Sequence, residues 1–349
     1  MTTSGSNSNR KRRKSAPLAP PPMMKSRKKA RKVTTLFHKY TRERDTAQEQ
    51  GKAVDVERLD RLIEDMGGRT EYQRASQVST SFHSTSKWVL GVLSRNGWLH
   101  GIVTESESES EPKIRNKKCP RRNTLCLEVG AINTELLDAA ACTLPEKETG
   151  VEVKKYRLQV NAVDIHSMHP GIEEADFLTM PIPSQKPEKR YDCIVCSMVL
   201  NCVTFPEQRR DMLARLYHFL RPNGLAFITI PKLCLTLSRY TDQARFRAML
   251  KAVGFEITET KESPKVAFFI CRRPASGSPV GLDPKWTKLT TIFRGKKYRN
   301  DFSIVLNEPS VTGRASLLTD EPAMIEETTE SAFIDVAEEE EDEEGGSSL

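Results

Sequence analysis

The sequence predicts an α/β protein whose core is a mostly parallel, seven-stranded sheet with helices on both faces. Two observations support this prediction. From residue 113 to residue 307, short apolar runs alternate with segments of helical periodicity, as in strands joined by crossover helices. Near the end of this region, two apolar runs follow each other with only a turn between them, which indicates that the sheet ends in an antiparallel strand.

Residues 43–112, which precede the predicted sheet, have the spacing of amphipathic helices. VERLDRLIEDM places apolar side chains on one helical face, and the pair Gly67 and Gly68 ends it. TSKWVLGVLSRNG repeats the pattern as far as Gly97. The run ESESESE, residues 105–111, follows as an acidic serine linker. We therefore expect a helical N-terminal region that is joined to the main domain by this linker.

Five strands are expected in the first part of the main domain. The first is TLCLEV, residues 124–129; the second is YRLQVNAVDI, with Asp164 at its end; a weaker third strand ends near Asp176. The fourth strand is YDCIVCSMV, and the fifth, LAFITI, follows the turn LRPNG. The helix EQRRDMLARLYHFL lies between these two strands. This alternation is typical of a Rossmann-like sheet.

The end of the domain leaves two arrangements open. DQARFRAMLKAVGF, residues 242–255, is an amphipathic helix that Gly254 ends, and it leads into FEITET and VAFFICRR. These two runs would form the final hairpin. NDFSIVL, residues 300–306, is the alternative to VAFFICRR as the second arm of that hairpin.

The two ends of the chain carry opposite charge. Residues 1–42 contain thirteen Lys and Arg and no acid, whereas residues 308–349 end in an acidic run that includes EEEEDEE. Such segments bury too little apolar surface to fold, so both are predicted to be disordered tails. RKRRK and KSRKKARK in the basic tail resemble a nuclear or nucleolar address and phosphate contacts, and a merely solvating tail is the alternative.

The sequence also excludes several classes of protein. No run of eighteen apolar residues is present and the basic N-terminus lacks a secretory apolar core, so we expect an intracellular protein without a membrane span. Its eight cysteines are then expected to be reduced. Cys193 and Cys196 have CxxC spacing, but they lie in an apolar run without a second ligand pair. A buried strand is therefore favoured over a metal site.

The turn after the first strand, LCLEVGAIN, has the position of a cofactor loop but only one glycine, Gly130. A dinucleotide loop needs more glycines in order to wrap a pyrophosphate. Glu128 can accept a hydrogen bond from an ammonium group, and Asp164 at the end of the next strand suits a ribose diol. A ligand with a ribose and an amino acid but no phosphate fits this set, and S-adenosylmethionine is such a ligand.

Further candidate residues follow the third and fourth strands. Asp176 and Phe177 are placed to contact the adenine of the cofactor, the carboxylate through the exocyclic amine and the ring by packing. Ser197 and Asn201, in CSMVLNCVTFPEQR, are polar groups in an apolar stretch. Two interpretations of them stay open, since they either orient an acceptor base or cap the following helix.

Several of these motifs together resemble the fungal 25S rRNA adenine-N1 methyltransferase family. The resemblance is carried by LCLEVGAIN, NAVDIHS, DFLTMPIP, SMVLNCVTFPEQRRDMLARLYHFLRPNGLAFITI, LCLTLSRY and KYRNDFSIVL, and it extends over residues 70–307 with YQRAS and TSKWVLGVL. It implies the class I methyltransferase fold with S-adenosylmethionine bound at Gly130 and Asp164, and from the cysteine pattern we expect no metal. It also implies a nucleolar enzyme acting on 25S rRNA or a pre-60S particle.

The chemistry that this resemblance implies sets the requirements for the acceptor site. Adenine N1 carries a lone pair, so the protein has to orient the base rather than deprotonate it. Ser197, Asn201 and the loop LCLTLSRY, with Arg239 and Tyr240, are the candidates for this task. The animal relatives are described as sensors of the methyl donor. The alternative is therefore a non-catalytic sensor that binds a protein partner.

Overall fold

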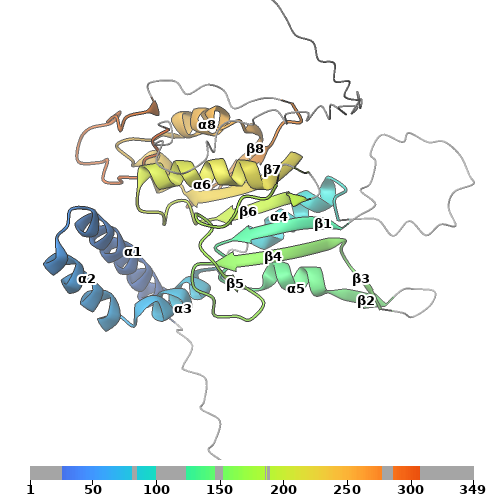
Figure 1. The fold of residues 1–349 in the computed structure, drawn as a ribbon, viewed down its shortest axis with the longest axis horizontal. Coiled ribbons are helices and arrows are strands. Elements are labelled where there is room, and N and C mark those ends of the chain that lie inside the picture. The colour runs from blue at the N-terminus through green and yellow to red at the C-terminus, as the bar shows by residue number, and fades with distance from the viewer. Residues whose placement is uncertain are drawn as a thin grey trace, which may run out of the picture. The chain divides into compact units, whose positions relative to one another are not determined.

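The computed structural model describes residues 26–80, 85–99, 123–145, 152–184, 186, 189–276 and 286–306. The predicted serine linker, most of the basic tail and the acidic tail lie outside these residues. Figure 1 shows the described part as a sheet that carries helices on both faces, with a helical group from the N-terminal region beside it.

The N-terminal region contains four helices: α1 (Arg27–Glu49), α2 (Ala53–Asp65), α3 (Gly68–Thr80) and α4 (Thr85–Arg95). The expected helices at α2 and α4 are confirmed. The predicted disordered tail to residue 42 differs from the structure, because residues 27–42 belong to α1. The reason is the side chain of Phe37, which is buried and stacks on Tyr72 of α3 at 4.3 Å between ring centroids.

Seven strands form one sheet in the order β5-β4-β1-β6-β7-β9-β8. Strands β5, β4, β1, β6 and β7 are parallel, and β9 pairs antiparallel with both β7 and β8. The mostly parallel sheet with an antiparallel end is thus confirmed. The strands are β1 (Thr124–Val129), β4 (Leu158–Asp164), β5 (Glu173–Glu174), β6 (Tyr191–Ser197), β7 (Leu220–Pro231), β8 (Glu256–Glu262) and β9 (Val266–Arg272).

Two apolar clusters pack on the two faces of this sheet. The first contains buried residues of α6 (Pro206–Phe219) and α8 (Gln243–Ala252), and the short helix α7 (Leu233–Thr236) adds to it. The second contains residues of α4 and of α5 (Glu135–Ala141). Trp88 of α4 contacts the sheet directly, with its ring 5.4 Å from that of Phe227. A separate small hairpin pairs β2 (Thr143–Pro145) with β3 (Glu152–Lys154).

Strand β6 shows why its CxxC sequence is not a ligand pair. Cys193 packs in the cluster under α4 and α5, while Cys196 packs in the cluster under α6 and α8. The two thiols lie on opposite faces because side chains three residues apart in a strand point to opposite sides. The predicted buried strand is confirmed. Within the described residues, no group of three or more His, Cys, Asp or Glu is placed to hold a metal ion.

The second arm of the final hairpin is Val266–Arg272. Of the two candidates for this arm, the structure therefore has VAFFICRR and not NDFSIVL. Residues 301–306 are mostly buried but form no strand. Arg209 holds this segment, since its guanidinium donates to the carbonyl of Ser303 at 2.7 Å and lies 5.1 Å from the ring of Phe302. None of the helices in the part of the chain that the structure describes is long and apolar enough to cross a membrane.

Candidate functional site

The carboxyl ends of β4, β1 and β6 meet at one edge of the sheet, and the turn after β1 lies between them. Gly130 has φ +71°, and its amide donates to the carbonyl of Val163 at 2.8 Å. A Cβ atom at this position would stand 2.3 Å from Cγ2 of Val199 in the loop after β6. Both the backbone conformation and the lack of space therefore require glycine here.

Glu128 lies two residues before this turn with its side chain buried. Burial, with a smaller effect of the nearby Glu135, raises the pKa of its carboxyl to about 8. Its Oε2 atom has no hydrogen-bond partner in the described part of the protein. A buried, unpaired carboxyl oxygen costs free energy, and an ammonium or hydroxyl donor would remove that cost. The residue therefore fits a ligand that brings such a donor.

Asp164, at the end of β4, is also buried, and burial raises the pKa of its carboxyl. Its Oδ1 atom accepts hydrogen bonds from the amide of His166 at 2.9 Å and from Nε2 of Gln73 at 3.0 Å. Gln73 also donates to the carbonyl of His166. Because Oδ1 is occupied in this way, Oδ2 is the oxygen left to accept from a hydroxyl of a ligand.

Gln73 is the site residue that the sequence analysis missed. It comes from α3, 91 residues before Asp164, and its Oε1 atom is buried without a hydrogen-bond partner among the described residues. Only its place in the quoted motif YQRAS pointed to it. A cavity of about 230 Å³ adjoins this contact. It is lined by Gln73, Gln77, Ala131, Ile132, Asn133, Thr134, Met168, His169 and Ile172.

Asp176 and Phe177 follow β5 but lie in different surroundings. The carboxylate of Asp176 is half-buried and accepts from the amide of Leu178 at 2.9 Å, so it stabilises the turn. The ring of Phe177 is buried in the core and packs on Phe219, 5.0 Å between centroids. Their predicted contacts with adenine stay predictions. The exposed apolar side chains on the loops after β4 and β6 include Ile165, 53% accessible and directly after Asp164, Met168 and Met198.

The loop after β6 carries the two predicted acceptor residues. The hydroxyl of Ser197 is hydrogen-bonded to those of Thr85 (2.8 Å) and Thr229 (3.0 Å). Asn201 donates weakly to the sulfur of Cys202 at 3.4 Å, and its Oδ1 atom is buried without a partner in the described chain. The N-cap of α6 is Phe205, without a side-chain cap. The structure therefore removes the interpretation that either residue caps this helix.

The N-terminal helices support the same loop. Cys202 lies 3.6 Å from Nε2 of His38 on α1, and Thr204 donates to Asp45 of α1 at 2.7 Å. Burial, with smaller effects of Arg42 and Arg69, lowers the pKa of His38 to about 4. This histidine is therefore neutral at physiological pH. Met198 in the loop has φ +61°, an unfavourable conformation for a side chain of this size, which the surrounding contacts maintain.

Tyr240 and Arg239 lie in the loop after α7. The amide of Tyr240 donates to the hydroxyl of Ser238 at 2.9 Å, and Ser238 in turn donates to the carbonyl of Phe302 at 2.6 Å. Arg239 is turned toward the last segment, where it donates to the carbonyl of Tyr298 at 3.1 Å and pairs with Asp301 at 3.5 Å. Arg239 thus anchors the loop, while the side chain of Tyr240 is half-buried.

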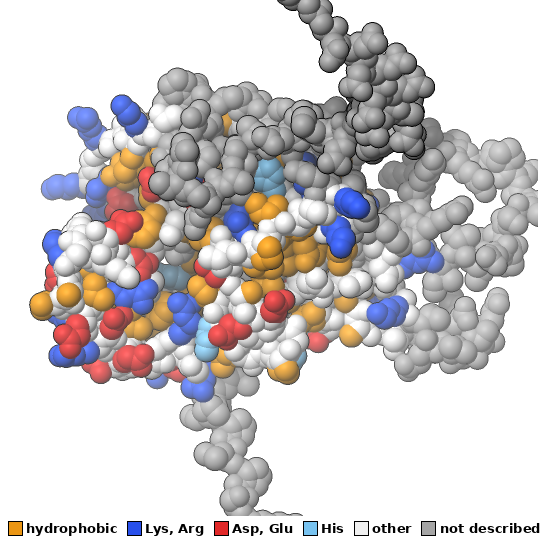
Figure 2. Space-filling view, in the orientation of Figure 1, with side chains coloured by type: hydrophobic (Ala, Val, Ile, Leu, Met, Phe, Trp, Pro, Cys, Tyr) orange, Lys and Arg blue, Asp and Glu red, His pale blue; other side chains and the backbone are white. Residues whose placement is uncertain are grey.

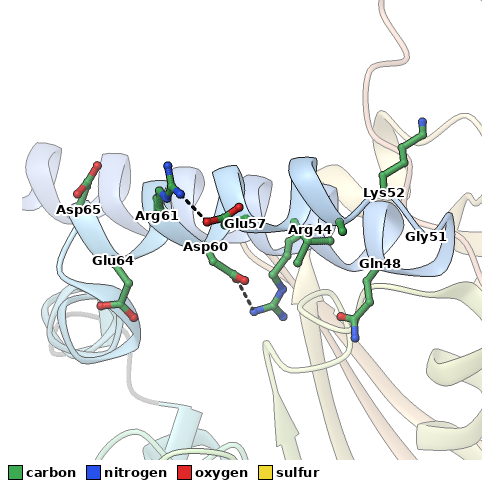
Figure 3. Close-up of a pocket in the computed structure, with 11 residues that line it drawn as sticks. Arg44, Gln48, Gly51, Lys52, Glu57, Asp60, Arg61, Glu64 and Asp65 are labelled. Atoms are coloured by element: carbon green, nitrogen blue, oxygen red, sulfur yellow. Dashed lines mark hydrogen bonds and ion pairs between the residues drawn. The ribbon is translucent and has the colours of Figure 1, made fainter.

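A second hollow lies between α1 and α2, and Figure 3 shows that charged side chains line it. The dashed lines there join Arg44 to Asp60 at 3.6 Å and Arg61 to Glu57 at 2.5 Å. None of the predicted site residues lines this hollow. Four of its charged groups form these two ion pairs, and its lining residues are distinct from the site at the strand ends.

Comparison with known proteins identifies one family. The model of the family described as 25S rRNA (adenine(2142)-N(1))-methyltransferase, Bmt2, matches residues 57–304. The 25S rRNA (adenine(2142)-N(1))-methyltransferase of Saccharomyces cerevisiae is 29% identical over 51% of this chain and 48% of its own. The 25S rRNA adenine-N(1) methyltransferase of Schizosaccharomyces pombe is 32% identical over 32% of this chain and 42% of its own. The matches thus span about half the length of these curated relatives.

Among solved structures, a putative sarcosine dimethylglycine methyltransferase from Galdieria sulphuraria is 13% identical, with a TM-score of 0.34. It covers 58% of this chain and 88% of its own. A 1,6-didemethyltoxoflavin-N1-methyltransferase from Burkholderia thailandensis is 15% identical, covers 44% and 72%, and has a TM-score of 0.33.

Proposed function

Because this chain belongs to the 25S rRNA (adenine(2142)-N(1))-methyltransferase family, we propose that it methylates N1 of an adenine in large-subunit ribosomal RNA with S-adenosylmethionine as the donor. The observation that supports this most directly is the pairing of the Glu128–Gly130 turn with Asp164 at adjacent strand ends. In parallel sheets, ligands bind at this edge.

The residues at the edge fit the proposed donor. Glu128 would accept from the ammonium group of its methionine part, which would satisfy the unpaired Oε2 atom. Asp164 would accept from a ribose hydroxyl through Oδ2, and the turn at Gly130 lets Val199 of the loop after β6 pack directly against it. When bound, the donor supplies an electrophilic methyl group.

The task of the protein is then to hold the acceptor base in place. Adenine N1 has a lone pair at neutral pH, so no general base is needed to activate it. Correct orientation of reacting groups lowers barriers by about 7–11 kcal/mol in favourable cases. The unpaired Oδ1 of Asn201 can accept from the exocyclic amine of adenine, and Ser197 and Tyr240 lie on neighbouring loops. N1 lies on the Watson–Crick edge, so the base must first leave its pair.

The substrate and the location follow from the same proposal. The acceptor is 25S rRNA, free or within a pre-60S particle, and the protein acts in the nucleolus. The basic motifs RKRRK and KSRKKARK support this, because clustered Lys and Arg bind phosphates and serve as nuclear addresses.

Primer extension on large-subunit rRNA tests the proposal. A methyl group on N1 blocks pairing, so reverse transcriptase is expected to stop at one adenine with the wild-type protein and to read through with Gly130→Arg. The matched control is Gly91→Arg on the exposed side of α4, where an added side chain meets no atom within 4 Å.

Two outcomes would contradict the proposal. A stop that persists with Gly130→Arg would mean that another enzyme makes the mark. A wild-type protein that binds S-adenosylmethionine by calorimetry but leaves no stop would favour the non-catalytic sensor instead.

A further inference from the structure

The segment from Lys288 to Asn300 forms an exposed loop with a strong positive charge. It carries five cations and no acid: Lys288, Arg294, Lys296, Lys297 and Arg299. All five are exposed, and none of them forms an ion pair within the part of the chain that the structure describes. Figure 2 shows Lys and Arg side chains gathered over this region, at the upper left. We call this segment the 288–300 loop.

Aromatic rings lie among these cations. The ring of Phe293 is half-buried and stacks on the half-buried ring of Tyr298, with 4.8 Å between centroids and an angle of 11° between planes. The ammonium of Lys297 lies 5.8 Å from the ring of Tyr298. Nucleotide bases stack well on aromatic rings that solvent can partly reach.

Backbone hydrogen bonds fix this loop beside the predicted acceptor site. The carbonyl of Arg239 accepts from the amides of Ile292 (2.8 Å) and Phe293 (3.1 Å). Ser238 and Asn300 form a β-bridge, and the amide of Arg239 donates to the carbonyl of Asn300 at 3.0 Å. The loop therefore adjoins Tyr240, the next residue along the chain.

We propose that the 288–300 loop binds the single-stranded RNA that flanks the target adenine. This rests on the proposed function, because it assigns a surface to its RNA substrate. The cations would contact phosphates, and Phe293 would stack with a neighbouring base. An acidic peptide would use the cations but not the ring, so the combination favours a nucleic acid with unpaired bases.

Binding of a fluorescein-labelled single-stranded RNA, measured by anisotropy at several salt concentrations, tests this proposal. The double variant Lys296→Glu/Lys297→Glu is expected to bind the RNA more weakly. Its plot of log binding constant against log salt concentration should also be flatter, by about 0.7 in slope for each lost phosphate contact. The control, Lys155→Glu/Lys189→Glu, makes the same charge change before β4 and β6, at the opposite edge of the sheet, and should keep the wild-type slope.

The ring is tested separately. Phe293→Ala is expected to weaken binding of the single strand by roughly 5- to 100-fold with an unchanged salt slope, and to have little effect on a duplex of the same sequence. Calorimetry with S-adenosylmethionine should give wild-type affinity for all variants.

The outcomes separate this proposal from the proposed function. If wild-type protein methylates RNA and the loop variants bind it with wild-type affinity and slope, the loop assignment is wrong and the function stands. If wild-type protein binds no single-stranded RNA, the loop assignment is overturned, whereas primer extension on large-subunit rRNA decides the proposed function. Equal losses of RNA affinity in the loop variant Lys296→Glu/Lys297→Glu and in the control Lys155→Glu/Lys189→Glu would indicate a general charge effect. This outcome would also overturn the loop assignment.

Discussion

Glu128 is a carboxyl group that the fold buries without a neutralising partner. Its folded-state pKa, about 8, lies above the ordinary value of 4.5, so the folded protein holds a proton that the unfolded chain has released between these two pH values. Stability is therefore greatest below pH 4.5 as far as this group is concerned, and it declines as the pH rises to about 8.

Replacing this carboxyl should remove that decline. We compare the free energy of unfolding of Glu128→Gln with that of the wild type at two pH values. The difference, variant minus wild type, should be larger at pH 8 than at pH 5 by on the order of 2–5 kcal/mol. Urea denaturation at both pH values measures the difference. Parallel stability curves for the two proteins would show that Glu128 is ionised in the folded state.

Gly130 combines a left-handed backbone conformation with a close neighbour. Gly130→Ala should lower the free energy of unfolding by about 1–3 kcal/mol, because the new methyl group strains the backbone and contacts Val199. Val199→Ala in the same chain should recover the contact part of this loss but not the backbone part. A double-mutant cycle with denaturation measures both, and full additivity would show that the two positions do not touch.

Among the elements, the start of α6, the loop before it and the last segment are linked by the side chain of Arg209. Arg209 donates to the carbonyls of Val203 at 3.0 Å, Thr204 at 3.0 Å and Ser303 at 2.7 Å. Burial lowers the pKa of its guanidinium to about 10, so it remains charged at neutral pH. A buried cation thus joins the acceptor loop to the last segment, beside the backbone hydrogen bond from the amide of Val305 to the carbonyl of Pro206.

Arg209→Lys should loosen both segments, since an ammonium group cannot reach three carbonyls in this planar arrangement. We expect a loss of about 2–4 kcal/mol in stability and faster hydrogen exchange in peptides covering residues 198–205 and 300–306. Arg272→Lys is the control, because its pair with Glu256 is exposed and contributes less than about 1 kcal/mol. Unchanged exchange in both peptides would contradict the role of Arg209.

An element could be predicted when the residues that stabilise it lie close together in the sequence, and was missed when they lie far apart. Strand β1 was predicted with its observed bounds because it is buried on both faces, so a continuous run of mostly apolar residues in the local sequence marks it. Strand β5 is only two residues long, too short for any periodicity. The helical part of the basic tail was missed because Phe37 packs against a ring 35 residues further along the chain.

The candidate site shows the same limit. Glu128, Gly130 and Asp164 could be predicted as neighbours at the strand ends because each lies at the end of a recognisable strand or directly after it. Gln73 was missed because its contact with Asp164 spans 91 residues. The burial of Phe177 depends on the packing of Phe219 of α6, which no local pattern expresses.

At the scale of the whole molecule, the N-terminal helices contribute side chains to the site at the carboxyl edge of the sheet. Helices α1 and α3 supply His38, Asp45 and Gln73 to loops at the carboxyl edge. Deleting residues 1–80 should leave the sheet folded, with its β signal in circular dichroism retained, but should weaken binding of S-adenosylmethionine. Calorimetry checks this, and deletion of residues 1–25 alone, before α1, is the control. Equal affinity of both truncated chains would show that α1–α3 do not shape the site.

The position of β1 in the sheet has a consequence for how the protein is made. This strand lies between β4 and β6, yet both of these follow it in the sequence, and the amide of Leu125 bonds to Asp192, 67 residues later. During synthesis, the apolar run TLCLEV therefore emerges from the ribosome before either partner strand exists. At about 5–20 residues per second, it remains unpaired for several seconds. During those seconds the nascent chain carries an unpaired apolar strand, the kind of segment through which incompletely folded chains aggregate.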